Sequence, residues 1–577
     1  MTWRVVAARR LRVRIVVRPL PMQSPPSSSG VALGHDPDCR STFYFSQSET
    51  AHGLEIRNSD GCGLGVFALH DIAVGERLLI EPPLLAWSKE RDGDDVELME
   101  DAVRRLRSDA RDAYWSLCQN AEHGATKNVY GIWLSNALPT EDEPATAAVF
   151  RIASRLNHSC RPNAHIAWQS QLKRMVLHAV VAIPKGSEVC IDYRGGGDGE
   201  TRDERRSGLQ SDFGFVCTCA LCSLTGSAQR ESDRRQARIA ELFGRISASP
   251  TPRNLVRLAE ERLSLLALEG IWTTWDTYGA AMSYLQCMGE ASHAARWAAR
   301  AASCASCALG RDSDEFRTFT AGMAGLEGEW LKAGRSLQSQ GYAILDGFAG
   351  ASASIELHTQ LSQLYRRARS TGHRSSSSSS AGSADGGGGR EREVPQKEED
   401  EEFSYGQIGG GSDGRAADVQ KDASIRGDRR ALIEVDDPRA PALRALFFLC
   451  DQLVGHLAAT GTVPELRSVK HRSRPMLACY EGEAARYVTH VDNPDDNGRL
   501  VTCIYYVNEK WEAKHGGELM LYPNATRSSS SKAAGVKVEP VLDRLVLFWS
   551  DARVPHEVLP AHASRLAVSS WYHHRTV

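Results

Sequence analysis

Two histidines and an aspartate in the C-terminal part of the chain have the residue types and spacing of a metal site. His490 and Asp492 stand two residues apart, so on a strand their side chains point to the same face. His556 is distant in sequence, and a neighbouring strand must bring it to the other two. Two imidazoles and one carboxylate on one face of an octahedral iron leave three positions open, as in non-haem Fe(II) sites that activate O₂. We therefore expect His490, Asp492 and His556 to share one iron.

Arg565 adds a site for an acidic co-substrate. It lies nine residues after His556, a separation that a hairpin can span. A guanidinium grips a carboxylate through two parallel hydrogen bonds, which suits the far end of 2-oxoglutarate. The alternative is a β-rich domain without metal, because an H-x-D pair arises by chance and a lone histidine is more often structural. The order favours the site: H-x-D, an aromatic strand, Gly516-Gly517, an apolar strand, Pro-His and then Arg.

A second group of chemically suggestive residues lies in the N-terminal half. The glycine-rich run Gly61–Ala68 precedes an apolar strand pattern, and glycines let a backbone approach a ligand closely. Cys217, Cys219 and Cys222 form a C-x-C-x-x-C group, and three closely spaced thiols suggest zinc, which needs a fourth ligand in a tetrahedral site. Cys160 is the natural candidate. Three unrelated buried thiols are the alternative.

The C-terminal region resembles the catalytic domain of the Egl-nine type, the hypoxia-inducible-factor prolyl hydroxylases. The matching runs are A-C-Y at 478–480, Y-V-x-H-V-D-N-P at 487–494, G-R-x-V-T-C-I-Y-Y at 498–506, F-W-S-D at 548–551 and P-H-E-V at 555–558. The resemblance implies an Fe(II) enzyme that uses O₂ and 2-oxoglutarate to hydroxylate a peptidyl proline, with L-ascorbate keeping the iron reduced. It makes His490, Asp492 and His556 the iron ligands and Arg565 the 2-oxoglutarate anchor. The other residues it implies are Tyr480, Tyr506 and Ser569 in the 2-oxoglutarate pocket, with Ser569 where Thr is more usual, and Arg499 and Trp571 at the substrate entrance.

The N-terminal half resembles a SET domain, the fold of protein lysine methyltransferases that use S-adenosylmethionine. The carrying motif is N-H-S-C-x-P-N at 157–163. The resemblance implies that Tyr193 lies beside the methyl-transfer channel and that Cys160, Cys217, Cys219 and Cys222 hold one post-SET zinc. The implied S-adenosylmethionine contacts are Gly63, Gly65, Asn157, His158 and Phe215, with Asn136 a weaker match.

The subtype resembles the SET-and-MYND proteins without the MYND finger, because the segment 81–150 holds one cysteine, Cys118. The usual G-E-E before the tyrosine is replaced by Gly186-Ser187-Glu188. Methyl transfer is an in-line displacement, so such a site must align sulfur, methyl and a neutral amine.

Length and composition set the broad organisation. At 577 residues the chain is too long for one core. The net charge of -3 shows no basic excess that would suit nucleic acid. Two sites that need free thiolates or Fe(II) favour a reducing compartment, so we expect a cytoplasmic or nuclear protein. No uninterrupted run of 18 apolar residues occurs, and we predict no transmembrane helix.

These features predict a multidomain α+β protein. Residues 1–50 form a leader, whose six arginines without an acid before residue 27 resemble an organelle transit peptide. A disordered leader or a misassigned start is the alternative. Residues 51–225 form the SET and post-SET domain. Residues 226–335 show helical periodicity and resemble tetratricopeptide hairpins. Residues 336–577 form a double-stranded β-helix (jelly-roll) oxygenase, interrupted by a low-complexity insertion at 370–422 that we expect to be disordered.

The function predicted from the sequence is a prolyl hydroxylase fused to a probable lysine methyltransferase. The substrates are proteins or peptides with a target proline and a target lysine, and we expect no nucleic acid or membrane partner. The alternative is an oxygenase acting on nucleic acid or a small molecule, with the SET region as a non-catalytic binding module.

Overall fold

The structure is a computed structural model of the whole chain. It describes residues 50–575 apart from 52, 60–62, 89–95, 121–122, 124–125, 141–145, 195–198, 248–251, 273–274, 373–403, 406–425, 438 and 524–534. The chain divides into two compact units, Met1–Gly322 and Met323–Val577, and each is described by itself. The predicted leader lies outside the described residues except for Thr50, and the finer domain bounds given above remain predictions.

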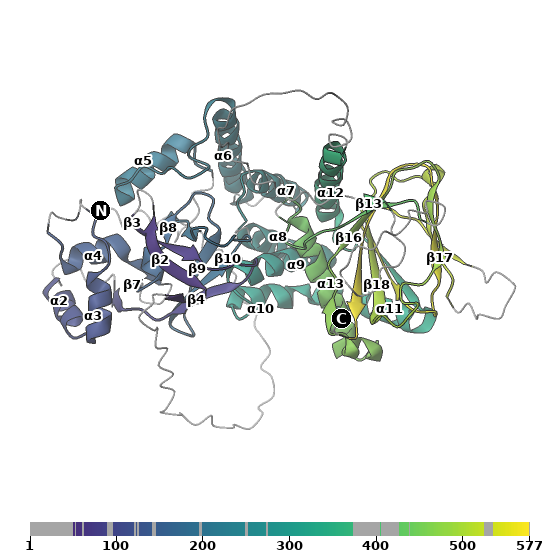
Figure 1. The fold of residues 1–577 in the computed structure, drawn as a ribbon, viewed down its shortest axis with the longest axis horizontal. Helices are drawn as coiled ribbons and strands as arrows, with labels where there is room; N and C mark the ends of the chain where they lie inside the picture. The colour runs from purple at the N-terminus through teal and green to yellow at the C-terminus, as the bar shows by residue number, and fades with distance from the viewer. Residues whose placement is uncertain are drawn as a thin grey trace, which may run out of the picture. The chain divides into compact units, whose positions relative to one another are not determined.

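Short strands form the core of the first unit (Figure 1). Their packed side chains include Val66, Leu78, Phe150 and Leu177, all fully buried. The antiparallel sheets are β1 (Thr50–Ala51), β2 (Leu54–Ser59) and β3 (Gly63–Ala68); β4 (Arg77–Glu81), β10 (Arg174–Ala179) and β9 (Ala164–Gln169); and β5 (Leu85–Ser88), β7 (Thr146–Val149) and β6 (Leu138–Thr140). A parallel pair, β8 (Asn157–His158) and β11 (Cys190–Ile191), joins the N-H-S-C motif to the segment that leads into Tyr193.

The helices of the first unit follow the predicted periodicity. They are α2 (Val96–Arg104), α3 (Ser108–Trp115), α4 (Val129–Asn136), α5 (Arg202–Phe213), α6 (Gly226–Ser247), α7 (Pro252–Leu268), α8 (Trp275–Cys287), α9 (Ala291–Ala308) and α10 (Asp314–Ala321). The helical periodicity predicted for residues 226–335 is confirmed by α6 to α10, whereas their tetratricopeptide-like pairing stays a prediction.

Helix α5 is bounded by clear local signals. Thr201 and Glu204 form a reciprocal capping box at its start, and Gly214 ends it with φ of +75°. A left-handed residue at this position is a common helix stop, and glycine adopts it without steric cost. The chain therefore turns directly into Phe215 and the C-x-C-x-x-C group.

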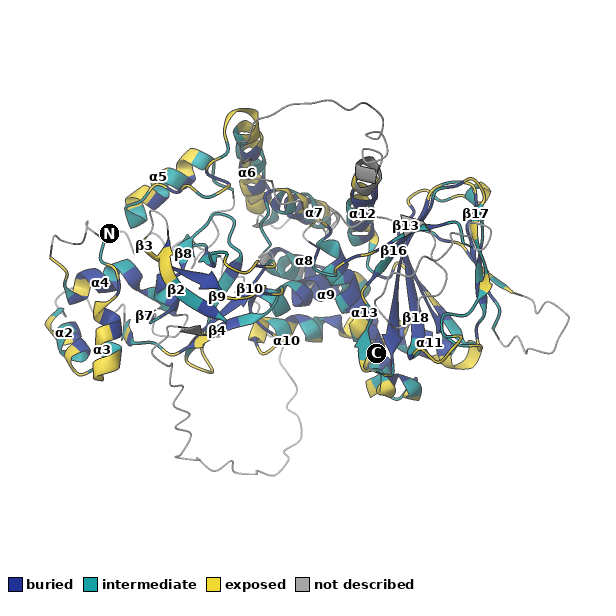
Figure 2. Ribbon diagram, in the orientation of Figure 1, coloured by how far each residue is buried: buried dark blue, intermediate teal, exposed yellow. Residues whose placement is uncertain are grey.

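The second unit contains two β-sheets (Figure 1). The larger has the order β12 (Tyr342–Asp346), β21 (Arg544–Trp549), β18 (Arg499–Tyr506), β23 (Arg565–His573), β16 (Met476–Tyr480), β14 (Arg429–Leu432) and β13 (Ser404–Tyr405), with β15 (His471–Arg472) also on β23. The smaller has the order β17 (Ala485–His490), β22 (His556–Ala561), β19 (Leu519–Leu521) and β20 (Val536–Val538). Figure 2 shows β16 and β18 of the larger sheet buried, whereas β17 is intermediate to exposed. This is the predicted jelly-roll type of architecture.

Three helices accompany these sheets: α11 (Glu327–Gln340), α12 (Ala351–Gly372) and α13 (Ala442–Ala459). Within the described ranges, α13 is the one helix long and apolar enough to cross a bilayer by length and composition. Half of that stretch is buried inside the protein, including Leu446, Phe447 and Leu453, as in the core helix of a folded domain.

Two details of this unit differ from what the sequence suggests. No hairpin joins His556 and Arg565, although their separation would allow one, because β22 pairs with β17 and β19 while β23 pairs with strands of the larger sheet. The segment 562–564 instead carries the chain from one sheet to the other. The insertion at 370–422 is also not wholly irregular: α12 continues to Gly372, and Ser404–Tyr405 form β13 by pairing their backbone with β14. The rest of the insertion, and the Ser-rich loop at 524–534, lie outside the described residues.

The packing of the larger sheet gives a direct stability test. Leu547 on β21 is 1% exposed, whereas Ile344 on the adjacent β12 is 38% exposed. Leu547→Ala should lower the free energy of unfolding by about 2–5 kcal/mol, because a buried cavity remains, and Ile344→Ala by less than about 1 kcal/mol. Urea unfolding followed by tryptophan fluorescence measures both. Equal losses would show that β21 does not lie in a packed core.

Candidate functional site

The predicted iron ligands meet at one end of the smaller sheet. His490 is the last residue of β17 and His556 the first of β22, and the two stand directly opposite each other in the antiparallel register. Their ring centroids are 4.3 Å apart. Asp492 lies two residues beyond the end of β17, so it reaches the site from a bend and not from the strand itself. One ligand atom from each of the three residues lies within 4.8 Å of the others.

The backbone orients both imidazoles. Nδ1 of His490 lies 2.8 Å from the carbonyl oxygen of Val488, and Nδ1 of His556 lies 3.3 Å from that of Val554. A carbonyl only accepts, so each Nδ1 carries its hydrogen and each Nε2 presents a lone pair. Burial, reinforced by the neighbouring His556, lowers the pKa of His490 to about 4, and burial also lowers the pKa of His556. Both rings are therefore neutral, as metal ligands must be.

Asp492 completes the donor set. Its Oδ2 accepts hydrogen bonds from the Thr502 hydroxyl (2.7 Å) and the Trp571 indole (3.0 Å). Its carboxylate oxygens lie 3.8 Å from Nε2 of His490 and 3.8 Å from Nε2 of His556. Burial opposes ionisation, but the hydrogen bonds from Thr502 and Trp571 stabilise the carboxylate, and the pKa of Asp492 lies below its usual range. Two neutral imidazole nitrogens and one carboxylate fit Fe(II).

The predicted 2-oxoglutarate residues share one face of the larger sheet. Tyr480 stands opposite Arg565 in the β16–β23 register, and Ile504 stands opposite Ser569 in the β18–β23 register. Opposed residues of an antiparallel pair point to the same face, as do residues two apart, so Arg565, Ser569, Tyr480 and Tyr506 face one way. The Arg565 guanidinium is 3% exposed, donates to the Tyr506 hydroxyl (3.1 Å) and to the Gly517 carbonyl (2.7 Å), and lies over the rings of both tyrosines.

The Gly516-Gly517 pair is required by close packing beneath Arg565. Both residues have positive φ, +62° and +74°. A Cβ on Gly516 would lie 2.3 Å from the carbonyl oxygen of Pro560, and one on Gly517 would lie 2.9 Å from Cδ of Arg565. A side chain at 517 would press on Arg565, whereas one at 516 would clash with the backbone of Pro560, so both positions favour glycine.

The predicted entrance residues adjoin the triad. The Arg499 guanidinium lies 4.2 Å from the centroid of the Trp571 ring and donates to the main-chain oxygen of Asp492 at 3.2 Å. On the other side, the Tyr487 ring stacks on His490 at 3.6 Å, and the Arg426 guanidinium lies 4.3 Å from the Tyr487 centroid. The triad is thus flanked by two arginine–aromatic pairs.

In the first unit, several predicted S-adenosylmethionine contacts come together around Glu188. Asn157 donates to Glu188 Oε1 at 2.7 Å, and the Ser59 hydroxyl donates to Oε2 at 3.0 Å. Gly65 lies so close that a Cβ on it would sit 2.1 Å from Glu188 Oε1. Gly63, with φ of +77°, has open space around the position of a Cβ. Asn136 is buried, and its side-chain amide donates to the carbonyls of Cys118 (2.6 Å) and Ile132 (2.7 Å). Its amide hydrogens therefore bond to neighbouring backbone in this structure.

Tyr193 lies in an aromatic group with His158, Phe213 and Phe215. Its ring centroid is 5.4 Å from that of His158 and 6.3 Å from that of Phe215. Its hydroxyl donates to the carbonyl oxygen of Leu156 at 2.7 Å. A cavity of about 730 Å³ lies beside it, lined in part by Tyr193, Phe213, Trp168 and Trp275. The indole nitrogen of Trp168 is buried there and has no hydrogen-bond partner.

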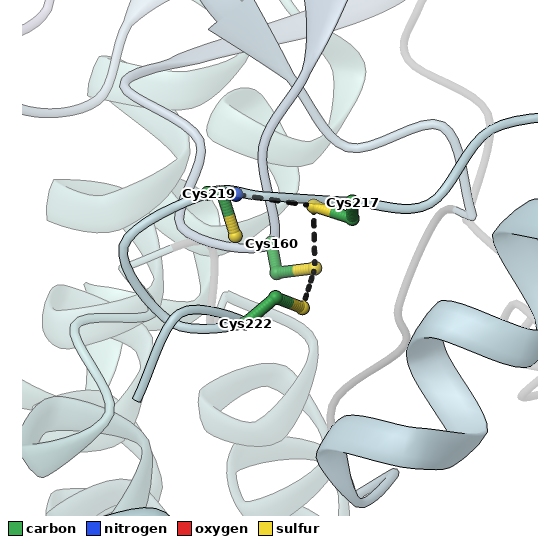
Figure 3. Close-up of side chains that lie close together, drawn as sticks. All are labelled: Cys160, Cys217, Cys219 and Cys222. Carbon is green, nitrogen blue, oxygen red and sulfur yellow. Dashed lines mark hydrogen bonds between the residues drawn. The ribbon is translucent and has the colours of Figure 1, made fainter. Parts of the chain in front are cut away.

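The four predicted zinc cysteines converge (Figure 3). The sulfur of Cys160 lies 3.5 Å from that of Cys222 and 4.0 Å from that of Cys217, and all four thiols are free. Tetrahedral ligands about 2.3 Å from a zinc ion would be roughly 3.8 Å apart, so the donor set fits zinc. Hydrogen bonds from Cys160 and Cys217 lower the pKa of Cys222 to about 7.

Several residues of these sites were not singled out from the sequence. Thr502 and Phe548 both touch the triad, Phe548 through a T-shaped contact with His556 at 4.6 Å. The alternation Thr502, Ile504, Tyr506 along one strand places Thr502 on the face of Tyr506, so periodicity carries a signal for it. Phe548 shows no such signal, because its strand is apolar on both faces.

Comparison with known proteins now adds to this geometry. Residues 475–573 match the 2OG-Fe(II) oxygenase superfamily, and residues 63–194 match the SET domain. Egl nine homolog 1 of Rattus norvegicus is 42% identical over 164 residues, which are 28% of this chain and 46% of that protein. Prolyl hydroxylase EGLN3 of Mus musculus is 44% identical over 149 residues, 26% of this chain and 59% of that protein. The chain therefore spans about half the length of these relatives.

The N-terminal region has a relative of its own. Histone-lysine N-methyltransferase set5 of Schizosaccharomyces pombe is 29% identical over 260 residues, covering 44% of this chain and 78% of that protein. Among solved structures, a prolyl hydroxylase from Trichoplax adhaerens in complex with a hypoxia inducible factor peptide fragment is 32% identical, with a TM-score of 0.32, over 43% of this chain and 90% of that one. The chain thus carries a SET domain over residues 63–194 and a 2OG-Fe(II) oxygenase domain over residues 475–573, with homologues among the Egl nine prolyl hydroxylases and the set5 methyltransferase.

Proposed function

We propose that the second unit hydroxylates peptidyl proline with Fe(II), O₂ and 2-oxoglutarate. The observation that carries the proposal is the buried guanidinium of Arg565 on the sheet face that meets the triad. Among the described residues, no carboxylate forms an ion pair with it, and its contacts are to neutral oxygens. A buried unpaired charge is costly, so this position favours a ligand with a carboxylate of its own.

Different residues of the second unit would bind Fe(II) and 2-oxoglutarate. His490, Asp492 and His556 would hold Fe(II), which activates O₂ while 2-oxoglutarate supplies two electrons by decarboxylating to succinate. Arg565 and Tyr506 would grip the far carboxylate of 2-oxoglutarate, and Tyr480 and Ser569 would line its pocket. Thr502 and Trp571 hold Asp492 in place. Ascorbate would serve as the reductant that restores Fe(II).

The substrate class rests on the relatives together with the entrance. Identity of 42–44% to Egl nine proteins over 149–164 residues supports a peptidyl proline. Arg499 stacked on Trp571 beside the triad offers an apolar plane and hydrogen-bond donors to a peptide.

The hydroxylase proposal predicts a metal-dependent mass change. Full-length chain incubated with Fe(II), 2-oxoglutarate, ascorbate, O₂ and a proline-containing peptide library should add one oxygen to a proline, detected by tandem mass spectrometry. His490→Ala should lower turnover by more than about a hundredfold, because it removes a direct ligand where even outer-sphere changes cost 10–100-fold. His562→Ala, exposed in the turn after β22, is the control. Succinate production without any modified proline would contradict the substrate class and leave the oxygenase standing.

We propose that the first unit transfers a methyl group from S-adenosylmethionine to a protein lysine. Gly65, Asn157 and Glu188 lie together on one side, and Tyr193 adjoins the 730 Å³ cavity on the other. Of the predicted cofactor contacts, His158 and the weaker match Asn136 line that cavity, whereas Gly63, Gly65, Asn157 and Phe215 do not. This separation supports a cofactor and a peptide that approach Tyr193 from different directions, as in-line displacement requires.

The methyltransferase proposal predicts a requirement for the Tyr193 hydroxyl. Tyr193→Phe should lower kcat for methylation of lysine peptides by about a hundredfold, since the hydroxyl and the Leu156 carbonyl it meets would align the amine. Tyr130→Phe, on the exposed side of α4, should leave the rate unchanged. Transfer of radiolabelled methyl from S-adenosylmethionine measures both. Equal rates in the wild type and Tyr193→Phe would remove Tyr193 from the reaction.

We further propose that Cys160, Cys217, Cys219 and Cys222 bind one structural Zn²⁺. The support is the convergence of four free thiols at distances that fit a tetrahedral site. Arg205, 4% exposed, is hydrogen-bonded to Cys222 and would offset the negative charge of the thiolates.

The zinc proposal predicts a defined metal content. Elemental analysis of the purified chain should find one zinc per chain, and Cys219→Ser should lose it because a serine hydroxyl is a poor zinc ligand. Cys118→Ser, an exposed thiol of the same unit, should keep it. Full zinc retention in Cys219→Ser would contradict the site.

A further inference from the structure

His158 lies between the cysteine cluster and Tyr193. Its Nε2 is 3.2 Å from the sulfur of Cys160, and its Nδ1 is 3.1 Å from the backbone nitrogen of Tyr193. The side chain is buried, 1% exposed. The ring therefore touches a cluster thiol with one nitrogen and the backbone of Tyr193 with the other.

The two contacts determine where the hydrogen of the ring lies. A backbone N–H only donates, so Nδ1 of His158 must accept from Tyr193 and carries no hydrogen. Neutral imidazole then has its hydrogen on Nε2, which donates to Cys160. The Cys160 sulfur accepts this hydrogen bond most strongly as a thiolate, which is also the form in which cysteine binds zinc.

No other group of the described residues competes for Nδ1 at hydrogen-bond distance. Asp192 Oδ1 lies 3.7 Å away, too far for a hydrogen bond, and accepts instead from the backbone of Arg194 at 3.0 Å. Tyr193 is thus fixed at two points, its amide by His158 and its hydroxyl by Leu156.

We propose that His158 is a positioning residue that couples the state of the cysteine cluster to the backbone of Tyr193. This inference rests on the proposed zinc site and methyltransferase. With Cys160 held as a thiolate, the hydrogen on Nε2 is fixed and the Nδ1 lone pair holds the Tyr193 amide. When Cys160 is not held, Nε2 loses its acceptor and Tyr193 loses a rigid anchor. The side chain of His158 acts through Tyr193 and is not itself a cofactor contact.

Amide hydrogen exchange at Tyr193 tests the coupling without any methylation assay. In the wild-type full chain, removal of metal with EDTA should raise exchange at the Tyr193 amide about tenfold, the loss of roughly one hydrogen bond. His158→Gln can donate to Cys160 but offers no acceptor at the δ position, so the amide should exchange fast with or without EDTA. His158→Asn keeps an acceptor at the δ position but does not reach Cys160, so the amide should stay protected in both conditions.

Controls separate this coupling from general loosening. Amides of residues 217–222 should exchange faster after EDTA in all variants, which confirms metal removal, and amides of the core strand β10 should not change, which confirms folding. His293→Gln, exposed on α9, should behave as the wild type. An EDTA response at Tyr193 that is equal in all variants, or absent in the wild type, overturns the inference.

Kinetics distinguish this role from the cofactor contact that the sequence suggests. His158→Gln should lower kcat about tenfold and leave KM for S-adenosylmethionine within about twofold. A rise in KM with unchanged kcat would return His158 to the cofactor site and overturn the positioning role. If the wild type methylates no peptide, the proposed function fails, and exchange at Tyr193 still decides the coupling.

Discussion

A carboxylate buried between two β-sheets is costly, and the second unit is arranged around one. Asp492 would be unstable as an anion without partners, because charge transfer from water to a protein interior costs several kcal/mol per ion even after relaxation. Its partners come from both sheets: His490 and His556 end or begin strands of the smaller one, and Thr502 and Trp571 lie on adjacent strands of the larger one. Thr502 and Trp571 are opposed in the β18–β23 register, so a one-residue slip of either strand would turn that strand's donor to the other face of the sheet. The strand pairing of the larger sheet therefore helps to keep the Asp492 carboxylate ionised.

The larger sheet also buries a positive charge, the guanidinium of Arg565. This guanidinium donates to the Tyr506 hydroxyl and the Gly517 carbonyl and lies over the rings of Tyr480 and Tyr506, and no carboxylate among the described residues pairs with it. A Cβ on Gly517 would lie 2.9 Å from Cδ of Arg565, so a glycine there leaves room for the arginine. The site thus has a buried cation at Arg565 and a buried anion at Asp492, which lies between two imidazoles. In the proposed function, a dicarboxylate would place one carboxylate at the metal and the other at Arg565.

Some contacts of the site could be predicted from the sequence, whereas others depend on strand pairing and side-chain orientation. The meeting of His490 and His556 follows from sequence, because two ligands of one metal on separate strands must be neighbours. The membership of β22 and β23 in different sheets does not, because the three residues at 562–564 are as compatible with a hairpin as with a crossing. Asp492 also lies past the end of its strand, where period-two reasoning no longer applies, and it reaches the site through a bend. In the first unit the spacing of Cys217, Cys219 and Cys222 indicated a metal. The contact between His158 and Cys160 depends on side-chain orientation, which the motif does not encode.

In both the His490–Asp492–His556 triad and the cysteine cluster, a backbone group facing Nδ1 of a histidine determines which ring nitrogen carries the hydrogen. At His490 and His556 the backbone presents a carbonyl to Nδ1, so the hydrogen sits there and Nε2 is a lone pair suited to a metal. At His158 the backbone presents an N–H to Nδ1, so Nε2 becomes a donor and cannot ligate, even though it lies 3.2 Å from a cluster sulfur. The backbone group that faces Nδ1 thus decides whether a histidine beside a metal site is a ligand or a donor to a ligand. Under the proposed coupling, His158 connects the thiol cluster to Tyr193, and the four cysteines would complete the proposed tetrahedral zinc site without it.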